Sequence, residues 1–593
     1  MAGLQALEYR GYDSAGLALV NEQGLQRIRT QGKVKELQKL WQSTPIEGEF
    51  GIAHTRWATH GKQNTRNAHP LVSRDSVALV HNGIIENHAE LREELQAAGF
   101  QFDSATDTEV MVHLIENLMS VGDDLFTAVQ KACKRLQGAF AIAVVTGRQP
   151  DTVVGARQGS PMVLGLADTE NFLASDVHAL LPHTNRFIYL EEGDVAEITS
   201  NGCRVVDSEG TPVDRPEKTT DLRPDSISKG EFDHYMQKEI HEQPSAIAET
   251  LEGRVYHGVI LPNIFGVDAS EVFDRVKRVQ IVACGTAYHA GLVARYQLEQ
   301  LAGLPCSVEV ASEYRYREPV VQEDTLFVSI SQSGETLDTL SAIRHAKKAN
   351  YLATLCICNV PESSVVRESD LVLMTRAGPE IGVASTKAFT TQLAALQLLV
   401  LELASRNGLS AEDVRDRVEE LEHLPQAIAE ALKLEGQIKR LAKRFTHKAH
   451  ALYLGRGSHY PIAMEGALKI KEITYIHAEA YPAGELKHGP LALVDRDMPV
   501  IAVAPNDELL GKLISNIEEV SARGGELIVI ADERAGANLA AHHGEVIKLA
   551  TGGRLLSPAV LTVPLQLLAY HVGLRKGTDV DQPRNLAKSV TVE

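Results

Sequence analysis

The chain has 593 residues, of which 44% are hydrophobic and 23% charged, and its formal net charge at pH 7 is −19. This length predicts several domains, because a single hydrophobic core rarely grows beyond about 250–300 residues. The acidic balance argues against binding to nucleic acid or to a membrane surface, since both favour basic patches. A small anionic substrate is still compatible, because a local site can oppose the global charge.

Six cysteines, at positions 133, 203, 284, 306, 356 and 358, show no CxxC pair and no zinc-ligand spacing. We therefore expect reduced thiols in a cytoplasmic protein, without a metal site. No signal-peptide pattern stands at the N-terminus. The longest apolar run, residues 393–404, is interrupted by Gln397 and is too short to span a bilayer, which predicts a buried helix.

In the first part of the chain, short β-type runs such as "SVALVHNG", "FAIAVVTG" and "DVAEIT" are broken by Gly, Asn and Asp, with a few helices between them. This pattern predicts an α+β domain of layered sheets over residues 1–222. The stretch 214–244 is polar and contains proline, which predicts a linker leading into a helix. We place this linker and its helix at residues 223–270.

Further along, strand–loop–helix units predict doubly wound parallel sheets, and these units occur twice. Gly285 and Glu313 are 28 residues apart, as are Gly457 and Glu485, and "LFVSISQSGE" aligns with "PVIAVAPNDE" in the same order. A repeat of this kind predicts two fused copies of one α/β unit. We place them at residues 271–412 and 440–583, followed by a tail at 584–593.

The stretch "SISQSGET" closes a predicted strand of the first copy. Ser331, Ser333 and Thr336 offer hydroxyl donors, Gly334 lets the backbone approach a ligand, and the next helix adds its positive end. Because ligands of open parallel sheets bind at the carboxyl ends of the strands, we predict a phosphate-monoester site here. The alternative is an ordinary Ser/Thr helix cap, which uses a single hydroxyl.

The second copy differs at both of these functional positions. Residues 504–507 read "APND", so an acid replaces a donor, and we predict that only the first copy binds phosphate. The helix predicted at 460–480 carries Glu465, Lys469 and Glu472 on one face. A surface ion-pair ladder is one reading of that spacing. The apolar neighbours favour the other, a sheltered carboxylate–lysine group that moves protons next to a carbonyl.

Longer motifs cover nearly the whole chain: "EYRGYDSAG", "HTRWATHG", "HNGIIENH", "TDTE", "ACGT", "SQSGET", "EIGVASTKAFT", "EGALKIKE", "ELKHGPLAL" and "DQPRNLAKSVTVE". Together they resemble the glutamine–fructose-6-phosphate aminotransferase (isomerizing) family, also called glucosamine-6-phosphate synthases. The resemblance implies an N-terminal-nucleophile glutaminase domain with αββα layers, two sugar-isomerase (SIS) domains, no cofactor and a homodimer. It implies synthesis of glucosamine 6-phosphate from fructose 6-phosphate with glutamine-derived ammonia, the first step of the hexosamine pathway.

The resemblance also implies residue roles in the sugar site. Glu472 would shuttle the proton between C1 and C2, assisted by Glu465 and Lys469. His488, from the neighbouring subunit, would help to open the sugar ring, and Lys588 would engage the open-chain carbonyl. The phosphate and the sugar would be bound by residues of the first copy, namely Cys284, Gly285, Thr286, Ser331, Gln332, Ser333, Thr336, Val383 and Ser385.

For the glutamine site, the resemblance implies that Arg56 binds the α-carboxylate and Asp107 the α-ammonium. The Asn82 side chain and the Gly83 N–H would form the oxyanion hole that stabilises the developing tetrahedral charge. Asn-Gly is also the strongest short signal for a hairpin turn, so that reading stays open. The remaining implied residues are Arg10, Thr59, His60 and Trp57, of which Trp57 could be a core residue or could gate ammonia passage.

The family's glutaminase begins Met-Cys-Gly-Ile and uses that cysteine as nucleophile, whereas this sequence begins "MAGLQALEYRGYDSAG". We expect the first strand to be missing, through a late-assigned start or a truncation, and the sheet to have an exposed apolar edge. A polypeptide of this sequence is then expected to isomerise fructose 6-phosphate and to use ammonium but not glutamine. The alternatives are a sugar-phosphate-binding regulatory protein, an ammonia-dependent isomerase only, or an amidotransferase with another acceptor.

Overall fold

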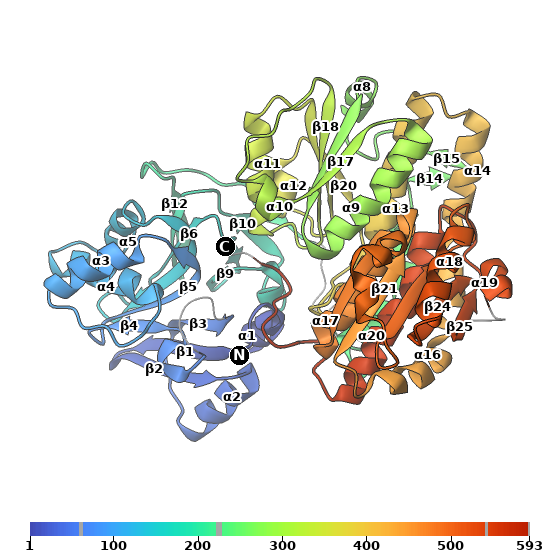
Figure 1. Ribbon diagram of the computed structural model, residues 1–593. Coiled ribbons are helices and arrows are strands. Elements are labelled where there is room, and N and C mark those ends of the chain that lie inside the picture. The colour runs from blue at the N-terminus through green and yellow to red at the C-terminus, as the bar shows by residue number, and fades with distance from the viewer. Residues whose placement is uncertain (58–62, 221–227, 540–543, 591–593) are drawn as a thin grey trace. The chain divides into compact units, whose positions relative to one another are not determined.

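The computed structural model describes residues 1–57, 63–220, 228–539 and 544–590, which fall into two compact units (Figure 1). The N-terminal unit contains residues 1–227, 335–337 and 587–593, and the C-terminal unit contains residues 228–334 and 338–586. The finer domain boundaries given above stay predictions.

The described residues of the N-terminal unit form three antiparallel sheets, with the strand orders β12-β11-β7-β6-β5-β4, β2-β1-β3 and β13-β10-β8-β9. The strands are β1 (Ser14–Asn21), β2 (Gly24–Gln31), β3 (Phe50–Arg56), β4 (Leu71–Ser73), β5 (Val77–Ile85), β6 (Gly138–Thr146), β7 (Val153–Gln158), β8 (Val163–Leu166), β9 (Asn171–Ala174), β10 (Arg186–Tyr189), β11 (Val195–Thr199), β12 (Gly202–Val206) and β13 (Glu217–Thr219).

Alternation along β5 explains how these sheets are layered. Leu79 packs under the helices α3 (His88–Ala97), α4 (Thr108–Ser120) and α5 (Leu125–Cys133), whereas its neighbours Ala78 and Val80 pack against Ile52 of β3. The four-stranded sheet covers the same face further along, where Leu164 meets Ile198. Helices α1 (Ala2–Leu7) and α2 (Val34–Ser43) pack on the outer side of β1 and β2. The predicted αββα layers are confirmed.

The C-terminal unit contains two parallel five-stranded sheets of identical topology, β17-β16-β18-β19-β20 and β22-β21-β23-β24-β25. This identity confirms the predicted repeat and the doubly wound class. The strands are β16 (Arg278–Ala283), β17 (Cys306–Val310), β18 (Thr325–Ser331), β19 (Ala353–Cys358), β20 (Leu371–Met374), β21 (His450–Gly455), β22 (His477–Pro482), β23 (Pro499–Ala504), β24 (Glu526–Asp532) and β25 (Glu545–Leu549).

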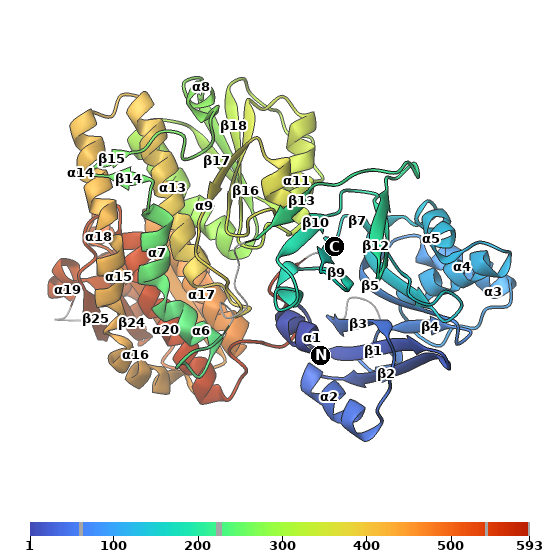
Figure 2. The ribbon, with the colours of Figure 1, turned by 180° about the vertical axis from the view of Figure 1, so that it is seen from behind.

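Helices cover both faces of each parallel sheet, as the view from behind shows (Figure 2). In the first repeat, strands β16, β18 and β20 are followed by the helices α9 (Gly285–Gln297), α11 (Leu337–Lys348) and α13 (Lys387–Arg406). In the second repeat, strands β21, β23 and β25 are followed by α17 (Tyr460–Thr474), α18 (Leu510–Ser521) and α20 (Ser557–Lys576). Helices α6 (Tyr235–His241) and α7 (Gln243–Leu251) precede the first repeat, and α14 (Ala411–Glu422), α15 (Leu424–Leu432) and α16 (Glu435–Leu441) connect the two repeats.

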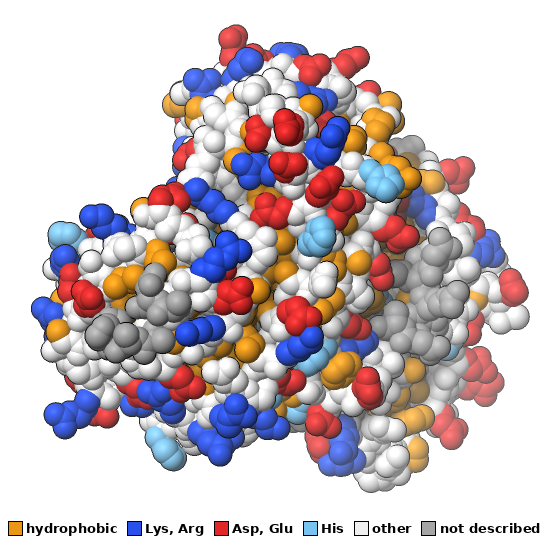
Figure 3. All heavy atoms as spheres, turned by 90° about the vertical axis from the view of Figure 1, so that its right-hand side faces the viewer, with side chains coloured by type: hydrophobic (Ala, Val, Ile, Leu, Met, Phe, Trp, Pro, Cys, Tyr) orange, Lys and Arg blue, Asp and Glu red, His pale blue; other side chains and the backbone are white. Residues whose placement is uncertain are grey.

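One apolar core joins the two repeats, with α13 and α20 at its centre. Both helices are long and apolar enough to cross a membrane, but 89% and 94% of their most apolar windows are buried inside the protein. Residues 393–404 lie within α13 and form the predicted buried helix. On the face drawn in Figure 3, the coloured acidic and basic side chains are interspersed rather than gathered by sign.

Candidate active sites

The hydroxyl-rich stretch lies at the carboxyl edge of the first parallel sheet, where the sequence placed it. Ser331 ends β18, and Gly334 adopts a φ of +65°, a conformation that favours glycine. The Gly334 N–H donates to Ser331 Oγ at 2.9 Å, so this hydroxyl helps to shape the loop. Ser331 and Ser333 are buried and Gln332 is half-buried.

The neighbouring strand places a second group of predicted residues beside this loop. Ala283 of β16 pairs with Ile330 of β18, so Cys284 and Ser331 follow at the same edge of the sheet. Adjacent strands are about 4.8 Å apart. Gly285 has a φ of +53° and begins α9, and Gly457 has the same φ at the corresponding turn of the second repeat. Burial raises the pKa of the Cys284 thiol, which keeps it protonated.

Thr286 of α9 connects this edge to the acid–base helix α17 of the second repeat. Its hydroxyl donates to Glu465 Oε1 at 3.0 Å and accepts from Lys469 Nζ at 3.0 Å. Lys469 Nζ also lies 2.7 Å from Glu472 Oε2 and 3.4 Å from Glu465 Oε1. The three predicted charges on one face of α17 are thus brought together with Thr286, which the resemblance assigned to the sugar site.

Burial decides between the two readings of this charged face. The side chains of Glu465 and Lys469 are 0% and 1% exposed, and that of Glu472 is 20% exposed. A surface ladder is therefore excluded. Burial alone lowers the pKa of Lys469, but Glu465 and Glu472 raise it overall. Burial alone raises the pKa of Glu465, but Lys469 and hydrogen bonds from His289 and Thr286 lower it. Glu465 and Lys469 are therefore held ionised, and Glu472 is the more exposed carboxylate of the group.

His289 is a member of this group that the sequence analysis missed. Its Nδ1 lies 2.8 Å from Glu465 Oε2, and the ring is buried. The available signal was its position three residues after Thr286, which puts both side chains on one face of α9.

The loop before α13 holds Val383 and Ser385, and it is fixed by Glu380. The Glu380 carboxylate accepts from the Thr386 N–H at 2.8 Å and from the Ala388 N–H at 3.0 Å, at the N-terminus of α13. Glu380 also contributes to the raised pKa of Lys469, so this loop lies near the charged group of α17.

The remaining predicted sugar-site residues are not brought to this group by the described contacts. His488 is exposed in the single chain, in the short helix η8 (Ala483–His488). Thr336 and Lys588 fall in the stretches 335–337 and 587–593 that belong to the N-terminal unit, where the Leu337 N–H donates to the Val590 carbonyl at 3.1 Å. Their roles stay predictions.

The second repeat uses its corresponding loop differently. Asp507 Oδ1 accepts from the Leu509 N–H at 2.9 Å, next to the start of α18. The acid that replaces a donor in this copy therefore serves the backbone of its own helix. Burial raises the pKa of Asp507.

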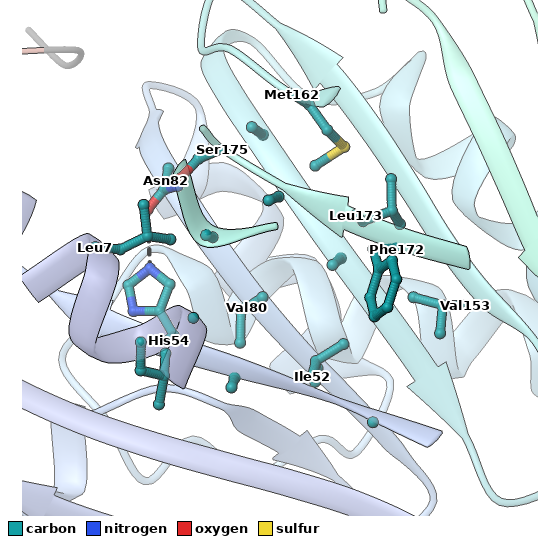
Figure 4. Close-up of a pocket in the computed structure, with 18 of the residues that line it drawn as sticks. Leu7, Ile52, His54, Val80, Asn82, Val153, Met162, Phe172, Leu173 and Ser175 are labelled. Atoms are coloured by element: carbon teal, nitrogen blue, oxygen red, sulfur yellow. Dashed lines mark hydrogen bonds between the residues drawn. The ribbon is translucent and has the colours of Figure 1, made fainter. Parts of the chain in front are cut away.

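The N-terminal unit contains a cavity of about 1000 Å³, drawn in Figure 4 with Asn82 among its labelled residues. Six of the predicted glutamine-site residues line this cavity. They are Arg10, Arg56, Trp57, Asn82, Gly83 and Asp107. Thr59 and His60 lie outside the described residues. None of the described residues that line the cavity is a cysteine.

Asn82 and Gly83 lie within β5, paired with Ala141 and Phe140 of β6. The hairpin reading of this Asn-Gly pair is therefore wrong, because both residues continue a long strand. Gly83 has a φ of +138°, and a Cβ there would lie 2.8 Å from the carbonyl carbon of Ala139, so only glycine fits. Gly83 is also one of the residues that line the cavity.

His54, which the sequence analysis missed, orients the Asn82 amide. Burial lowers the pKa of His54 to about 4, so the ring is neutral at pH 7. Its Nε2 lies 2.9 Å from Asn82 Oδ1 (Figure 4), and with the amide oxygen accepting this bond, the amide N–H donors are left for another partner. His54 and Arg56 are two residues apart on β3 and share a face, which was the available signal.

The charged residues of the cavity have structural partners as well. Asp107 Oδ1 accepts from the Thr108 N–H at 3.0 Å, and its Oδ2 accepts from the Ile85 N–H at 2.9 Å. Arg10 forms an ion pair with Asp176. Burial lowers the pKa of Arg56 although Asp107 raises it, and the guanidinium remains charged near pH 7.

Comparison with known proteins defines the class of enzyme. Residues 54–182 match the glutamine amidotransferase domain, and residues 273–402 and 444–574 both match the SIS domain. The chain is therefore a glutamine amidotransferase that carries two SIS domains.

Relatives of similar length define the family. The chain is 59% identical over 596 residues to glutamine–fructose-6-phosphate aminotransferase (isomerizing) of Pseudomonas putida, which covers 100% of this chain and 97% of that protein. It is 56% identical over 594 residues to the Escherichia coli K12 protein of that name, with the same coverage. The C-terminal domain of glucosamine-fructose-6-phosphate aminotransferase from Francisella tularensis, a solved structure, is 54% identical with a TM-score of 0.59, covering 60% of this chain and 100% of that chain. The chain belongs to the glutamine–fructose-6-phosphate aminotransferase (isomerizing) family, and the resemblance seen in its motifs is confirmed.

Proposed function

We propose that the C-terminal unit converts fructose 6-phosphate and ammonia to glucosamine 6-phosphate and water, and that the N-terminal unit releases the ammonia from glutamine. The observation that carries this proposal is the junction at Thr286, where the edge of the first sheet predicted to bind phosphate meets the buried charges of the second repeat. A sugar phosphate bound at Ser331 and Ser333 would reach from one repeat towards the other.

The chemistry begins with the open-chain sugar, whose C2 carbonyl is attacked by ammonia and loses water to form an imine. A base then removes one proton from C1 while the imine nitrogen gains a proton, and the C1 proton returns to C2 as the C1 hydroxyl loses its own proton, so that an aldehyde forms at C1 and an amine remains at C2. Glu472 suits this role, because its carboxylate is the partly exposed member of the charged group and Lys469 lies 2.7 Å away. Glu465 and Lys469 act as positioning residues.

The phosphate site belongs to the first repeat alone in this proposal. Hydroxyl donors at the carboxyl edge of a parallel sheet favour an anion, and the Ser331–Gly334 loop provides two of them, those of Ser331 and Ser333. In the second repeat, the Asp507 carboxylate stands at the equivalent turn and would repel a phosphate.

For the glutamine reaction, Asn82 and Gly83 would stabilise the tetrahedral oxyanion, and Arg56 and Asp107 would hold the two α-groups of glutamine. His54 supports this role by orienting the Asn82 amide. Hydrolysis would give glutamate and the ammonia that the sugar reaction consumes, and it also requires a nucleophile beside Asn82.

The proposal includes a cytoplasmic homodimer in which His488 and Lys588 complete the sugar site. His488 is exposed on the single chain and is available to a neighbouring subunit. A regulatory sugar-phosphate sensor, the alternative function, would need the phosphate loop but not the buried group of α17.

The test is formation of glucosamine 6-phosphate from fructose 6-phosphate and ammonium. We expect Ser331→Ala and Ser333→Ala to raise the KM for the sugar severalfold with little change in kcat, because each removes one neutral hydrogen bond of about 1 kcal/mol. Ser405→Ala, which changes an exposed serine of α13, is the matched control. We expect Glu472→Gln to lower kcat about 100-fold or more, while the sugar phosphate still raises the unfolding temperature.

Two results would contradict the proposal. An unchanged KM in both serine variants would remove the phosphate site from this loop. Full turnover by Glu472→Gln would remove the proton-transfer role of Glu472.

A further inference from the structure

Helix α6 and the start of α7 carry three polar residues that contact the loop before α13. They are Glu239, Glu242 and Gln243, whose spacing of three and four residues places them on one side of this helical segment. Helix α7 lies beside α13 (Figure 2). The lead-in segment, which belongs to neither repeat, thus faces the loop that holds Val383 and Ser385.

Glu239 binds the backbone of this loop. Its Oε1 accepts from the Ile381 N–H and from the Gly382 N–H, the second at 3.1 Å. Glu239 is only 2% exposed, so both bonds are shielded from water. Bonds of this kind, from an N–H to a carboxylate, are stronger than bonds between neutral groups. One buried oxygen therefore fixes two successive peptide units directly before Val383.

The fit between Gly382 and this carboxylate leaves no room for a side chain. A Cβ at Gly382 would lie 2.8 Å from Glu239 Oε2, whereas its next neighbour, the Met236 N, is at an ordinary 3.5 Å. Gly382 is not in the left-handed region, so its backbone alone does not require glycine. The Glu239 carboxylate is what requires it.

Glu242 and Gln243 hold the helix that follows the loop. Glu242 Oε2 lies 2.8 Å from Lys387 Nζ, at the first residue of α13. Gln243 Oε1 accepts from the Thr390 hydroxyl at 2.9 Å, one turn further along. The loop is thus held before its predicted sugar contacts by Glu239, and after them by its two neighbours.

Asp581 fixes α6 to the same loop. Its carboxylate accepts from the Tyr235 N–H at 3.0 Å and from the Met236 N–H at 2.9 Å, at the start of α6. Its backbone carbonyl accepts from the Val383 N–H at 3.0 Å. The helix that carries Glu239 is therefore itself anchored beside the loop.

We propose that Glu239 is a positioning residue for the sugar site. Through Ile381 and Gly382 it holds the loop 380–386 in the conformation in which Val383 and Ser385 bind the sugar phosphate. This inference rests on the proposed function of the C-terminal unit. A loop that is already ordered adds no ordering cost when the sugar binds, so losing the contact should weaken sugar binding more than it slows proton transfer at α17.

Steady-state kinetics of the full chain with fructose 6-phosphate and ammonium test this role. We expect Glu239→Ala to raise the KM for the sugar at least about tenfold, with kcat lowered by less than about threefold. Glu239→Gln keeps an oxygen that can accept from both N–H groups, so its KM should stay within about threefold of the parent value. Glu249→Ala, which removes an exposed carboxylate of α7, is the matched control and should leave KM unchanged.

Gly382→Ala tests the same contact with Glu239 in place. Its methyl group should displace the Glu239 carboxylate and raise KM. Added to Glu239→Ala, it should change KM by less than about twofold, because the overlapping carboxylate is then absent. This variant also decides the question where Glu239→Ala does not fold.

Hydrogen exchange on the free chain gives a readout that does not depend on turnover. The Ile381 and Gly382 N–H groups should exchange faster in Glu239→Ala than in the parent, and Glu239→Gln should restore their protection.

An unchanged KM in Gly382→Ala or in a folded Glu239→Ala, a Glu239→Gln variant as impaired as Glu239→Ala, or additive effects in the double variant would overturn the inference. Absence of turnover by the parent chain would instead overturn the proposed function, and a parent chain that turns over while these variants behave like it would overturn the role of Glu239 alone.

Discussion

The substitution Lys469→Met tests how much the buried ion pairs on α17 contribute to stability. The substitution keeps most of the apolar stem and removes the ammonium group. Glu465, whose side chain is 0% exposed, then loses the positive charge that lies 3.4 Å from its Oε1. Removing one partner of a buried ion pair costs about 3–5 kcal/mol, because the other charge is left uncompensated. Glu465 keeps its bonds to Thr286 and His289, so we expect about 3 kcal/mol.

The cost should also depend on pH with a predictable sign. In the native protein the folded pKa of Glu465 is lowered, so its contribution is present above the unfolded pKa of about 4.3 and is lost below it. Without Lys469 burial prevails and the folded pKa is raised, so the variant loses stability as pH rises. The difference between the two proteins should therefore be larger at pH 7 than at pH 5.

Urea unfolding measures both effects. Trp41 and Trp57 both lie in the N-terminal unit, so tryptophan fluorescence reports that unit, whereas far-UV circular dichroism also reports the C-terminal unit. We expect only the transition of the C-terminal unit to move. Lys471→Met, which removes an exposed charge of the same helix, is the control. Glu465→Gln combined with Lys469→Met should recover part of the loss.

A loss below about 1 kcal/mol, or an equal loss at pH 5 and pH 7, would refute the reasoning. It would mean that the charges on α17 are solvated in solution, as in the surface ladder.

Two further predictions concern the rest of the C-terminal unit. Gly334→Ala should destabilise the unit by clearly more than the roughly 1–2 kcal/mol that a left-handed alanine costs, because its Cβ would overlap Ser363 and lie 2.8 Å from Cys358 Sγ. It should also raise the KM for the sugar phosphate. Gly285→Ala, with the similar φ of +53° but no atom within 4 Å, should show only the backbone cost in urea unfolding, and equal losses in the two variants would contradict the steric argument. Glu435→Gln should reduce stability most below pH 6.5, because the hydrogen bond between His241 and Glu435 at 3.2 Å raises the pKa of the His241 ring. The stability that the charged ring contributes is present at low pH and is lost as pH rises through the raised pKa. A difference in unfolding free energy between the two proteins that grows from pH 6 to pH 9 would contradict this prediction.

Local patterns were sufficient for the parallel half of the protein. The β-runs that end at Ser331 and Ala504, and the equal spacing of the two copies, predicted the repeat, and the structure gives both sheets the same strand order. The spacing of Glu465, Lys469 and Glu472 predicted their shared face. Their burial could not be read from spacing alone, because α9 of the other repeat covers them.

Non-local pairing explains what the sequence analysis missed. Asn82-Gly83 has the composition of a turn, yet the nine residues of β5 pair with β6, and no short window around that dipeptide contains this information. His54 and His289 gain their roles from Asn82 and Glu465, which lie far along the chain.

The central claim is that two fused copies of one fold hold opposite ends of a single sugar. A crystal structure of the full chain with bound fructose 6-phosphate tests it most directly. We predict the phosphate group at the Ser331–Gly334 loop and carbons C1 and C2 beside the Glu472 carboxylate. A phosphate seated at Asn506 and Asp507, or a sugar out of reach of α17, would contradict the account.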